Sequence, residues 1–143
     1  MTTMNIPLYK KTSFGLSVIF AAVGLLFLLL PDGVIQFMNS LARQLKATEA
    51  PAGGQSVFLV LAGAYMYIVT LLAWLMFRHS YNLTYPLLLT QAKLISSILS
   101  FGFYFLKAPY FIYLANGIVD GLIGIIVLLF FIGLKKSIVA LKA

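Results

Sequence analysis

The sequence contains no cysteine, a single histidine (His79) and only three acidic residues, Asp32, Glu49 and Asp120, among 143 positions. The lack of cysteine excludes disulfides, thiolate metal sites and covalently attached c-type haem. One histidine and three scattered acids do not supply the clustered ligands of a zinc or calcium site. We therefore expect no metal, no cofactor and no catalytic residues, and no enzymatic activity.

Charge is scarce as well. Charged residues make up 9% of the chain and hydrophobic residues 62%, whereas a soluble domain has roughly 25% charged residues. Too few polar side chains remain to cover a soluble surface, so the composition predicts an integral membrane protein. The net charge of +7 then reflects basic residues that flank apolar spans and meet anionic lipid headgroups. We expect membrane lipids as partners and no nucleic acid.

Four apolar runs are long enough for the ~20 residues that a helix needs to cross the hydrocarbon core of a membrane. They cover residues 13–30, 56–77, 85–106 and 110–134. Lipid offers no partners to backbone N–H and C=O groups, so each run is predicted to be a helix. The first run is too long for the apolar part of a secretory signal and has no small-residue cleavage site, so we expect it to be retained. Residues 1–143 are predicted to form a single membrane domain.

The segment between the first two spans has a helical pattern of its own, over about residues 33–47. Its apolar residues fall on one face and its polar residues on the other, with Asp32 placed to cap the start and residues 50–54 placed to end it. Such a helix is typical of the membrane interface; packing on the mouth of the bundle or against another protein are alternatives. The predicted fold class is all-α: a four-helix transmembrane bundle with an additional amphipathic interfacial helix.

The basic residues are distributed unequally about the four spans. With the N-terminus inside, the inner side carries Lys10, Lys11, Arg78, Lys135, Lys136 and Lys142, and the outer side carries Arg43, Lys46 and Lys107. Inner loops of membrane proteins carry an excess of lysine and arginine. The distribution therefore predicts a multi-pass protein of the cell membrane with both termini in the cytoplasm.

Asp120 lies in the middle of the fourth run, where a charged side chain that faces lipid costs ~2.5–3.5 kcal/mol on insertion scales. We therefore expect it to face protein. It shares one helix face with other polar or small residues, namely Tyr113, Asn116, Gly117, Gly121 and Gly124. The third run has a polar face of its own, made of Thr90, Lys93, Ser96, Ser97, Ser100 and Tyr104. Because small residues let helices approach closely, we predict that these two faces meet, and that Gly63 is a packing position in the second run.

Two partners are conceivable for the Asp120 carboxyl group. Counting at 1.5 Å per residue from Leu87 in the third run and back from Leu134 in the fourth places Lys93 about 11 Å nearer the inner boundary than Asp120. Each side chain also leans toward the N-terminus of its own helix, which separates the two further. We therefore expect the carboxyl group to bond hydroxyl groups, with a direct Lys93–Asp120 bridge as the alternative.

No motif names an activity. The sequence favours a non-catalytic accessory or structural subunit of a larger membrane complex, with other membrane subunits or further copies of the chain as partners. A small proton- or cation-coupled transporter that uses Asp120 is the first alternative, since ionisable residues within a membrane are functional candidates. A lipid- or quinone-binding membrane protein is the second.

Overall fold

The computed structural model of the chain describes residues 4–51 and 56–142. This part of the chain folds into five α-helices: α1 (Ile6–Leu29), α2 (Pro31–Gln44), α3 (Ser56–Arg78), α4 (Thr84–Leu106) and α5 (Phe111–Lys142). Helices α1, α3, α4 and α5 are long and apolar enough to cross a membrane. The four predicted spans are therefore confirmed as helices, in the pattern of a multi-pass membrane protein.

Two of the long helices extend beyond the predicted spans. α1 begins at Ile6 because the side chain of Asn5 accepts a hydrogen bond from the backbone N–H of Leu8 at 3.0 Å, and Pro7 suits a first helical turn. α5 continues through Lys135 and Lys136, since lysine is a good helix former. Its 32 residues extend about 48 Å, more than the ~30 Å of a hydrocarbon core. The apolar runs locate a membrane boundary but not the helix ends.

The start of α2 differs from the prediction. The helix begins at Pro31, its N-cap residue is Leu30, and no side chain caps it. The predicted capping role of Asp32 is therefore wrong, and Asp32 lies inside the first turn. Proline suits this position because its missing N–H would have had no partner in the first turn of a helix.

The end of α2 also comes earlier than predicted, at Gln44. Lys46 adopts a positive φ of 52°, and the N–H groups of Lys46 and Ala47 donate to the carbonyl oxygens of Arg43 and Ala42 at 3.2 and 2.8 Å. This pair of bonds is the Schellman motif, which satisfies the last carbonyl groups of a helix. The predicted stop at residues 50–54 is not what ends the helix, and residues 52–54 lie outside the described part of the chain.

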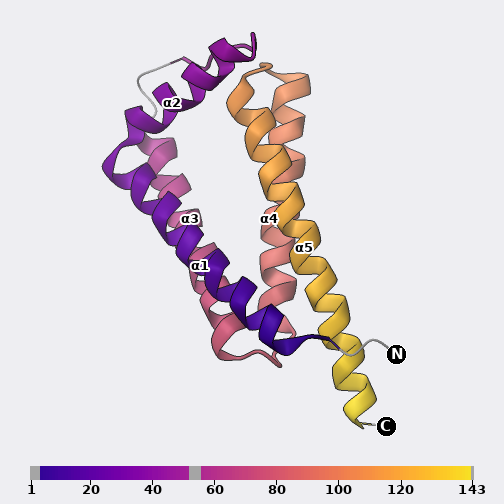
Figure 1. The fold of residues 1–143 in the computed structure, drawn as a ribbon. Helices are drawn as coiled ribbons and strands as arrows, with labels where there is room; N and C mark the ends of the chain where they lie inside the picture. The colour runs from indigo at the N-terminus through magenta and orange to yellow at the C-terminus, as the bar shows by residue number, and fades with distance from the viewer. Residues whose placement is uncertain (1–3, 52–55, 143) are drawn as a thin grey trace.

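The four long helices form two pairs that together make a wedge. α1 packs along α3, and α4 packs along α5 (Figure 1). The pairs meet at the end that holds both termini, called here the closed end, and diverge toward the opposite, open end, which α2 crosses (Figure 1). A backbone bond from Phe111 N–H to the Thr48 carbonyl oxygen, 3.0 Å long, joins the segment after α2 to the start of α5.

The hydrophobic core lies toward the closed end. The Tyr9 ring meets the Phe130 ring edge-on, with centroids 5.5 Å apart, and the backbone N–H of Met4 donates to Ser137 Oγ at 3.1 Å. The start of α1 is thereby attached to the end of α5. The largest fully buried side chains include Tyr9, Met76, Leu89, Leu134, Val69 and Val127.

Glycines set how closely the helices of each pair approach. A Cβ atom added to Gly124 would lie 2.7 Å from Leu94 Cδ2, and one added to Gly121 would lie 2.9 Å from Ser97 Oγ. In the other pair, a Cβ on Gly63 would lie 2.9 Å from a methyl group of Leu28. Small residues at such positions allow the backbones to come close and the helices to pack by van der Waals contact.

We predict that Gly124→Ala lowers the free energy of unfolding by about 1–3 kcal/mol, because the new methyl group displaces Leu94 from a well-packed interface. The matched control is Gly102→Ala, at a helical position with nothing within 4 Å of an added Cβ. This control should be neutral or slightly stabilising, since alanine is the better helix former. Unfolding by SDS in mixed micelles, followed by circular dichroism, measures both. Equal effects at the two positions would contradict the close packing of α4 on α5.

Candidate functional site

A buried ion pair joins α4 to α5. Lys93 Nζ lies 2.7 Å from Asp120 Oδ1, and the two side chains are 3% and 5% exposed. The direct bridge, which the sequence analysis held as the alternative, is therefore present. The expectation that hydroxyl groups would bond the Asp120 carboxyl group instead is wrong.

The prediction was wrong because it overestimated the difference in height between Lys93 and Asp120 along the helix pair. The contacts of Gly124 with Leu94 and of Gly121 with Ser97 place Lys93 level with residue 125, five residues from Asp120. At 1.5 Å per residue this offset is about 7.5 Å. It is less than the apolar runs had indicated because the inner ends of the two runs are not level: the same contacts place Leu87 level with residue 131 rather than with Leu134. The flexible four-carbon stem of lysine covers this distance.

The predicted polar faces of α4 and α5 do meet, and their hydroxyl groups hold the helices together. Ser97 Oγ donates to the carbonyl oxygen of Gly117 at 2.7 Å. Asn116 Nδ2 donates to Ser100 Oγ at 2.7 Å and lies 3.4 Å from Ser96 Oγ. The prediction that these faces pack against each other is confirmed.

Two of the predicted residues lie outside this cluster. The Tyr104 ring packs edge-on against Phe105, with centroids 5.1 Å apart, rather than against Asp120. Gly63 contacts Leu28 of α1, so it packs α3 on α1 and takes no part in the polar site. Tyr104 had been assigned to the polar face by its helical spacing on α4, whereas the prediction that Gly63 is a packing position is confirmed.

Two aromatic residues that the sequence analysis did not assign to the cluster complete the surroundings of Lys93. Its Nζ lies 4.6 Å from the ring centroid of Phe20 and 5.1 Å from that of Tyr65. The Tyr65 hydroxyl is held in place because it donates to the carbonyl oxygen of Ala92 at 3.1 Å. A cation over an aromatic face is stabilised by the ring quadrupole, most strongly where water is excluded. Nothing in the sequence distinguishes Phe20 from the other eleven of the twelve phenylalanines.

The ion pair leaves one acceptor unsatisfied. Asp120 Oδ2 is buried and has no hydrogen-bond partner among the described residues. A buried polar atom without a partner costs ~1–3 kcal/mol, and more when the group is charged. Such an atom in a protein interior requires an explanation.

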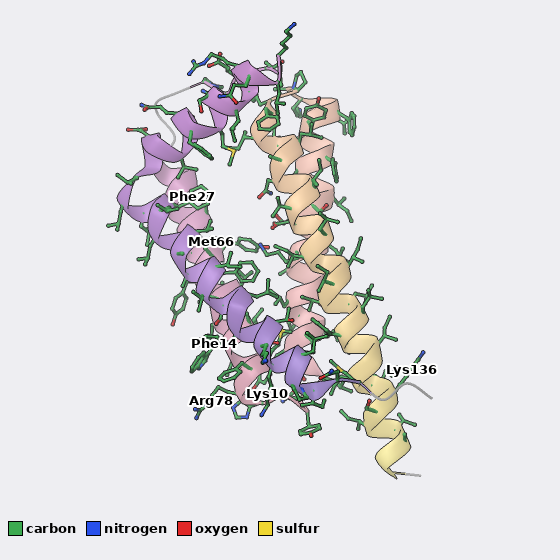
Figure 2. The ribbon with its side chains drawn as sticks, in the orientation of Figure 1. Lys10, Phe14, Phe27, Met66, Arg78 and Lys136 are labelled. Carbon is green, nitrogen blue, oxygen red and sulfur yellow. The ribbon has the colours of Figure 1, made fainter. Side chains whose placement is uncertain are left out.

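A cavity of about 390 Å³ lies beside the ion pair, between the two helix pairs. Its polar wall is formed by Lys93, Ser96, Asn116 and Asp120. The remaining walls are apolar and come from α1, α2, α3 and α5; they include Phe20, Val23, Phe27, Met38, Met66 and Ile123. Figure 2 labels Phe27 and Met66 on the α1–α3 pair.

The cavity opens sideways, toward the lipid-facing surface of the bundle. Two of its lining residues, Ile19 on α1 and Val119 on α5, are 55% and 53% exposed. The mouth therefore lies between α1 and α5. A groove along the opposite side of the wedge, which Ile95 and Leu99 of α4 help to line, shares Tyr65 and Ser96 with the cavity.

Within residues 4–51 and 56–142, no three histidine, aspartate or glutamate side chains lie together as metal ligands. His79 is exposed and lies beside Tyr85, with ring centroids 6.0 Å apart. It follows directly on α3, whose C-terminus lies at the closed end. Among the described residues, the polar side chains that line the cavity are therefore the Lys93–Asp120 ion pair, the amide of Asn116, and the hydroxyl groups of Ser96 and Tyr65.

No protein-family model, curated protein or solved structure matches this chain. The distinguishing features of the site are an apolar cavity that opens to the surface between α1 and α5, a neutralised charge pair in one wall, and a buried carboxylate oxygen that has no partner among the described residues.

The ion pair predicts a strongly non-additive double-mutant cycle. Lys93→Met or Asp120→Leu alone should lower the free energy of unfolding by about 3–5 kcal/mol, because each leaves an uncompensated buried charge. The double variant should recover most of that loss, since two apolar residues replace two ions. SDS unfolding in mixed micelles measures all three variants.

The exposed pair Arg43–Glu49, whose atoms lie 3.0 Å apart and whose side chains are 63% and 40% exposed, provides the control. Removing either of its partners should change stability by less than about 1 kcal/mol. Additive losses at Lys93 and Asp120 would show that the two charges do not depend on each other.

Proposed function

We propose that this protein binds an amphiphilic molecule from the bilayer in the cavity between its helix pairs. The observation that carries the proposal is the cavity of about 390 Å³ with apolar walls and a single polar wall. Small-molecule sites are typically ~300–1,000 Å³, mostly apolar, with a few polar groups that orient the ligand. Of the functions predicted from the sequence, this is the lipid- or quinone-binding one.

The sideways mouth supports a ligand that comes from the membrane. A lipid-like molecule can pass between Ile19 and Val119 without crossing water, and its tail can remain in the bilayer. Its head would lie beside Asp120, where an otherwise apolar chamber presents polar atoms. The core below, which includes Val127 and Leu134, closes the cavity toward the closed end.

The other two predicted functions stay predictions. A carrier that uses Asp120 needs a carboxylate free to take up an ion, whereas here Lys93 already compensates its charge. The accessory-subunit function would use exposed apolar helix faces as docking surfaces. Exposed apolar faces do not favour the accessory-subunit function over ligand binding, because every membrane-spanning helix presents an apolar face to lipid.

In this proposal α2 lies in the membrane interface and covers the open end of the wedge. Val34 and Met38 line the cavity and Ile35 is buried, while Asp32 and Gln36 are exposed. An interfacial helix places its apolar face toward the acyl chains and its polar face toward water. The apolar face of α2 would then be shared between the ligand chamber and the lipid.

We further propose that the closed end faces the cytoplasm. Figure 2 shows Lys10, Arg78 and Lys136 at that end. The open end, which α2 crosses, carries Arg43 in the last turn of α2 and Lys46 just after the helix. The closed end carries the excess of basic residues, and the positive-inside rule assigns the side with this excess to the cytoplasm.

Ligand binding in the cavity is tested by a substitution that fills the cavity with a larger side chain. A bilayer lipid with a photoreactive diazirine in its acyl chain should label cavity-lining peptides of the purified protein in nanodiscs. Ala62 lines the cavity, whereas Ala64, two residues along the same helix, is exposed and does not. Ala62→Phe should reduce labelling of these peptides several-fold, and Ala64→Phe should leave it unchanged, as mass spectrometry of the peptides would show. Equal labelling in both variants would refute binding in the cavity.

The orientation is tested with single cysteines, because the natural chain has none. His79→Cys, at an exposed position of the closed end, should react with a membrane-impermeant maleimide only after the cells are permeabilised. Lys46→Cys, at an exposed position of the open end, should react in intact cells. The reverse pattern would invert the proposed topology.

A further inference from the structure

We infer that the α1–α3 pair binds an anionic phospholipid on its exposed surface at the closed end. The phosphate group bonds Lys10 and Arg78, and an acyl chain lies along a cluster of three aromatic rings, those of Phe14, Trp74 and Phe77. None of these residues lines the cavity, so this inference does not depend on the proposed function.

The aromatic cluster joins α1 to α3. The ring centroid of Phe77 lies 5.4 Å from that of Phe14 and 5.4 Å from that of Trp74, and the centroids of Phe14 and Trp74 are 6.3 Å apart. Aromatic rings at such distances stabilise each other. Although the rings contact one another, Phe14 remains 46% and Trp74 40% exposed. Three mutually packed rings therefore offer a lipid a surface that is already in place, so that little side-chain entropy is lost on binding.

Two basic residues lie next to this cluster, nearer the closed end. Lys10 precedes Phe14 by four residues in α1, about 6 Å along the helix axis, and Arg78 directly follows Phe77 at the end of α3. Both basic side chains are exposed, and Figure 2 shows them with Phe14 at the closed end. Neither belongs to either of the salt bridges found in the described part of the chain. The surface therefore presents two positive charges that no carboxylate of the described chain compensates.

A phospholipid matches both parts of this surface. The guanidinium fork of Arg78 suits phosphate oxygens, and the ammonium group of Lys10 adds further donors. The rings of the cluster lie one helical turn deeper than Lys10. Aromatic side chains are enriched at this level of a membrane, where the head groups end and the acyl chains begin.

The charge of the site favours a lipid with a net negative charge. Each lysine or arginine near a membrane surface attracts anionic lipids. Phosphatidylcholine carries a trimethylammonium group, which the two basic residues repel, whereas phosphatidylglycerol carries a phosphate group and no cation. We therefore expect the site to prefer phosphatidylglycerol.

Binding at this site can be observed directly, because Trp74 is the single tryptophan of the chain. Phospholipids that carry bromine on their acyl chains quench tryptophan fluorescence on contact. The purified protein is placed in nanodiscs of phosphatidylcholine and phosphatidylglycerol, with bromine on only one of the two lipids. A titration of the lipid composition should show that phosphatidylglycerol occupies the position next to Trp74 with about tenfold preference over phosphatidylcholine.

The two basic residues are tested one at a time. Arg78→Gln and Lys10→Gln should each lower the preference about fivefold, the contribution of one basic residue near a membrane surface. Lys136→Gln is the matched control, since it removes the same charge from an exposed residue of the closed end but lies on α5, apart from Arg78 in Figure 2. This control should keep the preference. All three positions are exposed, so the substitutions should leave the fold intact, which circular dichroism checks.

Two outcomes would overturn the inference. The first is equal quenching by the two brominated lipids in the wild-type protein. The second is a loss of preference in Lys136→Gln as large as that in Arg78→Gln, because anionic lipid would then respond to the overall charge of the protein and not to a local site. Neither outcome bears on the cavity, whose test is labelling by the diazirine lipid, and a failure of that labelling would leave the quenching of Trp74 unaffected.

Discussion

The Lys93–Asp120 pair imposes a constraint that the rest of the structure has to meet: two opposite charges in the apolar part of a membrane protein must be enclosed by protein. Enclosure requires α4 and α5 to lie close together. The close contacts at Gly121 and Gly124 permit that approach, and the Ser97 bond to the Gly117 carbonyl oxygen fixes it. The ionic contact and the small-residue packing therefore depend on each other, since neither charge could be buried beside helices held farther apart.

The interfaces within the helix pairs and between them use side chains of different sizes. Within each pair glycines meet the partner helix, as Gly24 does, where an added Cβ would lie 3.1 Å from Met66 Cβ. Between the pairs, beside the cavity, Phe20 and Tyr65 stand next to Lys93. The two pairs come together toward the closed end, where the core around Tyr9 and Leu134 is packed. The cavity lies on the open-end side of that core, bordered by Phe20 and Tyr65.

Much of this architecture could be predicted from the sequence, because apolar runs and helical periodicity are local signals. They identified four spans and the two polar faces that meet between α4 and α5. The register of those faces was not predictable from the runs, because the inner ends of the third and fourth runs are not level with each other in the packed helices. Phe20 was missed for another reason: its role depends on the position of α1 beside Lys93, and no pattern within α1 encodes that contact. The start of α2 was misjudged because Pro31 and Asp32 both suit the beginning of a helix, and only the backbone conformation shows which position each takes.

The position of the ion pair in the wall of the cavity argues that the pair serves for more than stability. If stability were the only requirement, apolar residues of similar volume at both positions would serve at least as well, since burying an ion pair gains little net free energy. A pair that is enclosed on one side and borders a cavity on the other provides something that an apolar pair does not. Its Lys93–Oδ1 contact holds the carboxylate in a fixed position, and the pair gives an otherwise apolar chamber one polar wall, together with Ser96 and Asn116. A chamber with a single polar wall orients an amphiphilic ligand, which an entirely apolar chamber does not.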